Sequence, residues 1–232
     1  MSTFEFNING DPNNILLFKV KKIVNAGYTG SNQEEVQKHI DELKEKGIPG
    51  PDEIPTYFPK FRDRLTQKEE VEALDEIGHT GEAEYVLLCA GDEIYIAAGS
   101  DHTDRLVEQA SIPKAKQVYP NFISKDVWML SEVRDHFDRI ILRAVVEKDG
   151  KEIVFQEAPL SALLSPDELY ALVKDIVTDT EGLAIFSGTV NALVDLDCTP
   201  VFRTELDDPV LGRKLSCSYR MKTIDSWFKG KL

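Results

Sequence analysis

The run from Glu82 to Ala98 constrains the fold of this 232-residue chain most, because it predicts two strands paired through a tight turn. Aliphatic and aromatic residues dominate Glu82–Ala90 and Glu93–Ala98, and Gly91-Asp92 separates the two runs. Two such runs joined by two turn residues are typical of a β-hairpin. The hairpin predicts that a sheet lies at the centre of the fold.

Other strands are predicted on both sides of this hairpin. Arg139–Glu147 and Glu152–Gln156 predict a second hairpin, turned at Asp149-Gly150. Further β-prone runs cover Ile15–Val24 and residues 183–187, 200–206 and 213–222. Because the predicted strands outnumber the helices, the expected fold class is α+β with a β-rich core.

Two helices are predicted. The first is expected to begin at Ser31, because Ser31 and Glu34 form the Ser-x-x-Glu pattern of a capping box, and to end at Gly47 and Pro49. Its apolar stripe comprises Val36, Ile40 and Leu43. The second opens at Ser165, where a cap, a proline and two acids suit a first helical turn.

The chain is expected to contain one large domain. Residues 1–14 are polar and are expected to be an adaptable end, followed by a single domain over residues 15–232. Residues 48–66 carry four prolines and predict extended cover instead of regular structure. Together with the first helix, residues 27–66 form a candidate lid.

The charge and cysteine content narrow the function classes. A formal net charge of -14 repels phosphate backbones and anionic lipid, so nucleic-acid and membrane partners are not expected. The N-terminal sequence lacks the basic and apolar regions of a signal peptide. Three widely spaced cysteines fit a reducing compartment, so a cytoplasmic protein is expected.

Three acids near the first hairpin predict a metal site. Glu82 and Glu84 are two residues apart, so on a strand their carboxylates point to one face, and Asp101 follows the second strand. Carboxylates aimed at one spot need a positive charge between them, and an oxygen-only set favours Mg2+ or Mn2+. Alternating acids are also common on the solvent-facing side of an edge strand, and the residues alone leave that alternative open.

Other polar residues have both a functional and a structural interpretation. His39 and Glu42 lie three apart on the first helix and suit either a general base oriented by a carboxylate or an exposed pair. Lys116 is either a cation of the site or a surface lysine. His102 follows the third acid and suits either the site or a structural hydrogen bond. Gly188-Thr189 ends a predicted strand as a turn or as a carboxylate-binding segment.

The order of these elements resembles the catalytic domain of the fumarylacetoacetate hydrolase superfamily over Ile23 to Met221. A closer likeness is to a bacterial branch catalogued as a domain of unknown function. It is carried by Ala26-Gly-Tyr-Thr-Gly30, Gly99-Ser-Asp-His-Thr-Asp-Arg105, Asp208-Pro-Val-Leu-Gly-Arg213 and Ser218-Tyr-Arg220.

The resemblance implies a β-roll-like mixed sheet, a homodimer and a divalent metal, Mg2+ or Mn2+. Its implied metal ligands are Glu82, Glu84 and Asp101. His39 and Glu42 would activate water from a lid, and Lys116 would face the substrate and offset developing negative charge. The implied substrate contacts are Arg105, His102, Gly188 and Thr189.

The substrates implied by the resemblance are small anionic 2-oxo or 1,3-dicarbonyl acids. The implied enzyme is a hydrolase or decarboxylase that cleaves a C–C bond through a metal-stabilised enolate. A hydratase or isomerase on the same scaffold is one alternative. A non-catalytic binding protein that retains the fold is another.

Overall fold

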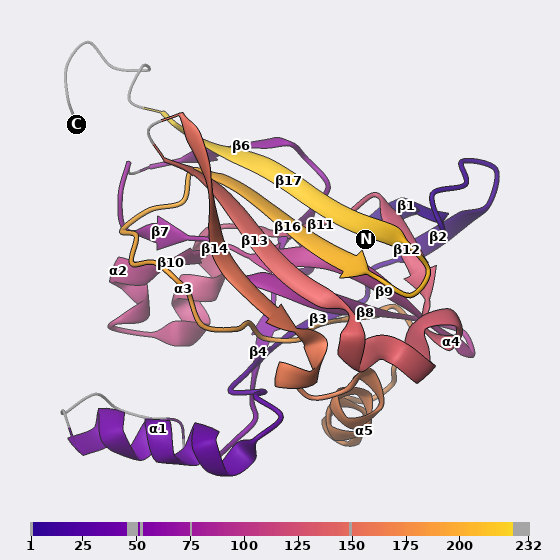
Figure 1. Cartoon of the computed structure of the whole chain (residues 1–232), viewed down its shortest axis with the longest axis horizontal. Helices are drawn as coiled ribbons and strands as arrows, with labels where there is room; N and C mark the ends of the chain where they lie inside the picture. Colours follow the sequence, from indigo (N-terminus) through magenta and orange to yellow (C-terminus); the bar gives the residue numbers. More distant parts are fainter. Residues whose placement is uncertain (1, 46–50, 52, 75, 149, 225–232) are drawn as a thin grey trace.

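Two β-sheets packed face to face form most of the structure, a computed structural model that describes residues 2–45, 51, 53–74, 76–148 and 150–224 (Figure 1). In these residues the larger sheet has ten strands. Eight of them run in the order β2 (Ile15–Lys19), β1 (Thr3–Ile8), β12 (Asp126–Met129), β9 (Glu93–Asp101), β8 (Ala83–Ala90), β15 (Leu183–Phe186), β3 (Lys22–Gly27) and β4 (Thr56–Lys60), while β11 (Asn121–Ile123) pairs with β9 and β5 (Leu65–Thr66).

The second sheet covers one face of the larger one and has five strands in the described ranges. Their order is β14 (Lys151–Pro159), β13 (Ile141–Lys148), β16 (Val201–Asp208), β17 (Arg213–Thr223) and β6 (Glu70–Ala73). A small pair joins β7 (His79–Thr80) to β10 (Thr103–Asp104). The prediction of a β-rich α+β fold is confirmed.

Strand β8 is buried on both faces of the larger sheet. Tyr85 and Leu87 belong to the core cluster shared with the second sheet, whereas Val86 and Leu88 belong to a second cluster shared with the N-terminal strands. This division follows from the alternation of side chains along a strand. Polar side chains at the start of β8 are therefore held close to a dry interior.

Both predicted hairpins are confirmed with small shifts in their bounds. β8 and β9 pair antiparallel with Ala90 opposite Glu93, and Gly91 in the turn has a φ of 61°, which favours glycine. β13 and β14 pair in the same way. Residue 149 of their turn lies outside the described residues.

Two segments expected to be irregular contain strands. Residues 3–8, expected to belong to an adaptable end, form β1 because Phe6 and Ile8 alternate with more exposed residues and are buried. β4 lies in the proline-rich segment and includes Pro59. It is an outermost strand of the larger sheet, and edge strands tolerate proline.

The helices lie at the margins of the sheets. α5 (Pro166–Ile176) begins as predicted, with a reciprocal capping box between Ser165 and Glu168. α1 (Gln33–Glu45) begins two residues after Ser31 and stands apart from the sheets in Figure 1; its predicted end at Gly47 and Pro49 lies outside the described residues. The short helices are α2 (Arg105–Glu108), α3 (Ile112–Val118), α4 (Leu130–Val133), η1 (Arg62–Arg64), η2 (Arg134–Arg139) and η3 (Leu160–Ala162).

In the described ranges, none of the helices has the length and apolar character needed to cross a membrane.

Candidate metal centre

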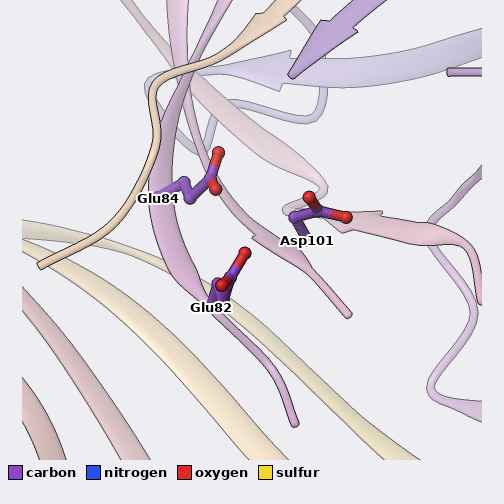
Figure 2. A group of neighbouring side chains, drawn as sticks. All are labelled: Glu82, Glu84 and Asp101. Carbon is purple, nitrogen blue, oxygen red and sulfur yellow. The ribbon is translucent and has the colours of Figure 1, made fainter. Parts of the chain in front are cut away.

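Three carboxylates meet where β8 begins and β9 ends. Glu82 and Glu84 flank the first residue of β8 and point to the same face of the larger sheet. Asp101 lies across from Glu82, and its N–H donates to the Glu82 carbonyl at 3.2 Å. One oxygen of each carboxylate lies within 4.8 Å of the others, and Figure 2 shows the three side chains turned toward one another.

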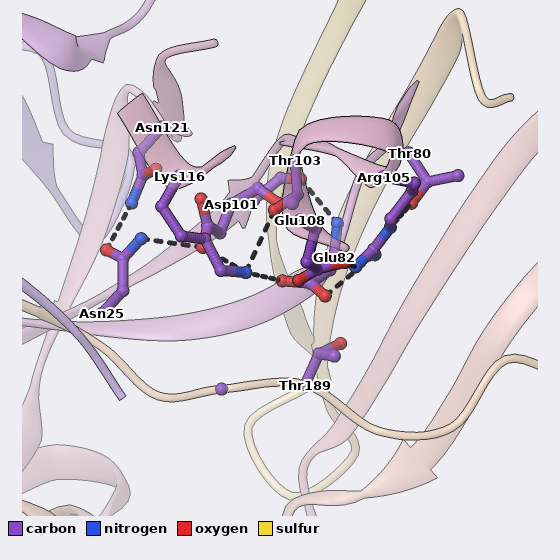
Figure 3. Close-up of polar contacts among 12 residues, drawn as sticks. Asn25, Thr80, Glu82, Asp101, Thr103, Arg105, Glu108, Lys116, Asn121 and Thr189 are labelled. Atoms are coloured by element: carbon purple, nitrogen blue, oxygen red, sulfur yellow. Dashed lines mark hydrogen bonds and ion pairs between the residues drawn. The ribbon is translucent and has the colours of Figure 1, made fainter. Parts of the chain in front are cut away.

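The ammonium group of Lys116, on α3, lies between two of these carboxylates (Figure 3). Its Nζ is 2.6 Å from Glu82 Oε2 and 2.8 Å from Asp101 Oδ2, and it donates to Thr103 Oγ1 at 3.0 Å. Burial acts to lower the pKa of Lys116, but Asp101 and Glu82 outweigh it and raise that pKa. Lys116 is therefore a permanent cation of the centre.

Arg105, the first residue of α2, is the second cation beside the triad (Figure 3). Its Nε donates to Thr80 Oγ1 at 2.6 Å, and its two terminal nitrogens donate to Glu82 at 2.9 Å and Glu108 at 2.8 Å. Burial acts to raise the pKa of Glu82, but Lys116 and Arg105 together lower it to about 2. Glu82 is therefore ionised at neutral pH.

Glu84 is the least satisfied member of the triad. It is 2% exposed, the Gly188 N–H donates to its carboxylate, and its Oε2 atom has no hydrogen-bond partner. Burial, followed by the charges of Asp101 and Glu82, raises the pKa of Glu84 well above its ordinary value. A buried oxygen without a donor costs free energy that a cation at this point would recover.

The donor set fits a hard divalent cation. All three candidate ligands are carboxylates, which Mg2+ and Mn2+ prefer over nitrogen or sulfur. Among the described residues, Glu82, Glu84 and Asp101 are the group of acidic, His or Cys side chains close enough to share one ion. The partnerless oxygen of Glu84 is the feature of this centre that a cation would complete.

Three residues that the sequence analysis did not identify surround Asp101. Asn25 Nδ2 donates to Asp101 Oδ2 at 2.7 Å, and Asn25 Oδ1 accepts from Asn121 Nδ2 at 2.8 Å. The buried Lys60 Nζ lies 3.5 Å from Asp101 Oδ1. Lys60 also donates to the Lys116 carbonyl. A polar residue inside the buried strand β3 is a signal that could have revealed Asn25.

A cavity of about 180 Å³ opens beside the triad. It is lined by Ala26, Gly27, Tyr28, Phe58, Glu82, Glu84, Glu108, Ile112, Lys116, Gly188 and Thr189. The sequence analysis assigned no role to Tyr28, Phe58, Glu108 or Ile112. A larger hollow of about 700 Å³, lined by Lys21, Lys22 and Arg62 among others, does not contain the acidic cluster.

Thr189 lines the cavity, but its hydroxyl already makes hydrogen bonds with other residues of the chain. It donates to the Ala83 carbonyl at 2.7 Å and accepts from Gln156 Nε2 at 2.8 Å, while Gln156 Oε1 accepts the Ala83 N–H at 3.0 Å. Both backbone groups of the residue between the two glutamates are thus held. Gly188 has a φ of 81°, and a Cβ there would lie 2.5 Å from Thr29 Oγ1, so the position requires glycine.

The structure places His102 outside the residues that line the cavity, and its expected contact with substrate stays a prediction. Successive residues of an extended chain point to opposite sides, so His102 turns away from the face that carries Asp101. It is fully buried, with His79 Nδ1 at 2.7 Å and the Tyr219 hydroxyl at 2.9 Å from its ring nitrogens. Burial, then His79, lowers the pKa of His102 well below its ordinary value. These contacts fit the structural hydrogen bond that was the alternative interpretation of His102.

His39 and Glu42 lie on α1, but their side chains fall outside the described residues. Their action as a water-activating dyad stays a prediction. The same holds for closure of residues 27–66 over the cavity.

Comparisons with known proteins agree with this architecture. The family model described as "Protein of unknown function (DUF2848)" matches residues 26–219. A search of curated proteins finds no matching relative. Yeast ynq8, a fumarylacetoacetate hydrolase family protein, is 14% identical with a TM-score of 0.57, over 88% of this chain and 93% of that chain.

Two enzymes with bound metals have a similar fold. 2-Keto-3-deoxy-D-arabinonate dehydratase, complexed with magnesium and 2,5-dioxopentanoate, is 14% identical with a TM-score of 0.60, over 91% of this chain and 77% of that chain. 4-Oxalocrotonate decarboxylase from Pseudomonas putida G7, complexed with calcium and acetate, is 14% identical with a TM-score of 0.54, over 89% of this chain and 78% of that chain. The chain therefore has the fold of fumarylacetoacetate hydrolase family proteins.

Proposed function

The chain belongs to the DUF2848 family of proteins of unknown function, and we propose that it is a metal-dependent enzyme acting on a small 2-oxo acid. The observation that carries this proposal is the convergence of Glu82, Glu84 and Asp101 together with the partnerless, buried oxygen of Glu84. Buried polar atoms in folded proteins are normally paired. The exception supports a site that is completed by a cation from outside the chain.

We propose Mg2+ or Mn2+ as that cation, held by Glu82, Glu84 and Asp101. The all-carboxylate donor set supports this choice. When bound, the cation would act as a Lewis acid on the carboxylate and keto oxygens of a 2-oxo acid. A 2-oxo acid is a suitable substrate because its two adjacent oxygens present one negative charge and one polarisable carbonyl.

Side chains of the cavity supply the remaining chemistry. Lys116 lines the cavity as a buried ammonium group, so it would offset negative charge that develops on the substrate. Arg105 holds Glu82 and Glu108 at fixed positions through two terminal nitrogens. Phe58 gives the lining an apolar surface that limits the access of water.

Within this class, we propose cleavage of a C–C bond by hydrolysis or decarboxylation. Hydrolysis requires an attacking water, for which the predicted base is His39 with Glu42, whereas decarboxylation does not. A hydratase or isomerase is the second candidate, because the fold is shared with a dehydratase that was complexed with magnesium and 2,5-dioxopentanoate. Product analysis separates the two, since only the first shortens the carbon skeleton.

Calorimetric titration with Mn2+ tests the proposal. The wild type should bind Mn2+, Glu84→Gln and Asp101→Asn should bind it at least about tenfold more weakly, and pyruvate, a 2-oxo acid with one carboxylate, should bind only when the metal is present. Glu93→Gln, which neutralises an exposed glutamate on β9, is the matched control and should bind Mn2+ normally. Unchanged Mn2+ affinity in both triad variants, or equal pyruvate binding in chelator, refutes the proposal.

A further inference from the structure

We propose that the substrate carries a single carboxylate and that its remaining part, which lies away from the triad, is uncharged. This inference rests on the proposed function and deepens it by naming the substrate class. It follows from the charges around the cavity and from the residues that line the cavity beyond the triad.

The charged side chains that contact one another at the centre nearly balance. In the described part of the chain, four carboxylates alternate with three cations, Lys60, Lys116 and Arg105. The carboxylates are Glu82, Glu84, Asp101 and Glu108. With a divalent cation added, the cluster has one positive charge in excess when all four carboxylates are ionised. One substrate carboxylate neutralises it, and a second would have no partner in a site where unpaired charge is costly.

The cations already present are not free to receive a second carboxylate. Lys116, the cation that lines the cavity, lies at 2.6 and 2.8 Å from the oxygens of two triad carboxylates. Arg105 donates to three protein oxygens, including Glu108 Oε2 at 2.8 Å. A guanidinium or ammonium group that is already paired offers a second anion little net attraction.

The residues beyond the triad favour an uncharged tail. Glu108 lines the cavity with a side chain that is 25% exposed, and although Arg105 pairs with its Oε2, the carboxylate offers only acceptor oxygens, so a terminal carboxylate would find no donor there. Tyr28 has a φ of 58°, a backbone conformation uncommon for a bulky residue, and this holds it at the cavity. Phe58 and Ile112 complete this part of the lining. A short hydrocarbon tail would pack against the ring of Phe58, and a hydroxyl group on the tail would pair with the Tyr28 phenol or the Glu108 carboxylate.

Two acids of equal length test the inference, because 2-oxopentanoate and 2-oxoglutarate differ in a terminal carboxylate. Binding of each to the Mn2+-loaded wild type is measured by calorimetry. The expected result is that 2-oxopentanoate binds at least about tenfold more tightly. Glu108→Gln, which keeps the size and removes the charge, should strengthen 2-oxoglutarate binding and narrow the ratio. Glu93→Gln, an exposed site on β9, should leave the ratio unchanged.

The outcomes separate this inference from the proposed function. Equal or tighter binding of 2-oxoglutarate by the wild type overturns the inference and leaves the proposed function standing. Binding of neither acid by protein that has bound Mn2+ overturns the proposed function and this inference with it. An unchanged ratio in folded Glu108→Gln protein overturns the assignment of Glu108, and the wild-type comparison decides the inference even if that variant does not fold.

Discussion

Replacing Glu84 with glutamine should stabilise the metal-free protein while removing its response to metal. The substitution keeps the size of the side chain and removes a buried charge whose Oε2 atom has no partner. Because the pKa of Glu84 is raised in the folded chain, its favourable contribution exists below the ordinary value of 4.5 and is lost as the pH rises. At neutral pH the carboxyl group therefore opposes folding, and glutamine does not.

The magnitude follows from the distances in the triad. Two unit charges 4.8 Å apart repel by about 3.5 kcal/mol at an effective dielectric constant of 20. Lys116 offsets part of this repulsion, whereas a buried polar atom without a partner adds a cost of about 1–3 kcal/mol. We expect the substitution to raise the free energy of unfolding by a net amount on the order of 1–3 kcal/mol. In a chain of this size, each kcal/mol raises the melting temperature by about 2–4 °C.

Thermal unfolding with and without metal is the assay. In chelator at neutral pH, Glu84→Gln should melt above the wild type, and the difference should shrink as the pH falls from the raised pKa of Glu84 toward its ordinary value of 4.5. With Mn2+ at about 100 times its dissociation constant, the wild type should gain about 2.7 kcal/mol. The variant should gain little, because it lacks one carboxylate of the triad.

Glu82→Gln is the matched control on the same strand, and its expected effect has the opposite sign. Glu82 bonds to Lys116 and Arg105, which lower its pKa to about 2. Its contribution to stability is therefore present above the ordinary value of 4.5 and is lost as the pH falls toward 2. Neutralising it leaves two cations short of a partner, so the variant should melt below the wild type. If both variants shift in the same direction in chelator, the account of the charges in the triad is wrong.

Three further predictions concern other parts of the site and the core. Arg105→Lys should weaken metal-dependent pyruvate binding by about tenfold or more in calorimetry, because one ammonium cannot replace three guanidinium contacts; unchanged affinity contradicts this. Gln156→Leu leaves the buried Ala83 N–H unpaired, so it should lower the free energy of unfolding by about 1–3 kcal/mol and weaken Mn2+ binding. Gln156→Glu keeps the acceptor oxygen and should recover part of both the stability and the Mn2+ affinity. Burial raises the pKa of Cys217 to about 12 and of the half-buried Cys198 to about 11, so mass spectrometry should find both unreactive toward iodoacetamide near pH 8, and rapid alkylation of native Cys217 counts against its burial.

The strands that local pattern predicts are those whose turns and periodicity lie within a short stretch of sequence. The β8–β9 hairpin is of this kind, because Gly91-Asp92 separates two apolar runs. Two of the strands that the pattern did not predict, β1 and β4, form for other reasons. β1 is held by distant partners, β2 and β12, and β4 contains Pro59, which is compatible with a strand only because β4 lies at the edge of the sheet.

The same distinction applies to the site. Glu82 and Glu84 share a strand face, so their convergence follows from local geometry, and the antiparallel partner brings Asp101 opposite. Asn25 and Lys60 reach Asp101 from β3 and β4, which sequence spacing alone does not place beside it. The roles of such residues depend on long-range pairing of strands, which periodicity does not report.

The contacts of the triad explain both how its charges are balanced within the fold and where a cation would bind. Lys116 and Arg105 pair with Glu82, and Lys116 and Lys60 lie against Asp101, so most of the buried negative charge is balanced without a metal. Glu84 has a backbone donor and an oxygen without a partner. A fourth basic side chain at that point would stabilise the fold but would fill the position that a metal needs. An unpaired carboxylate oxygen lowers the stability of the fold. Functional sites commonly contain such locally unfavourable groups, because selection acts on function as well as on stability.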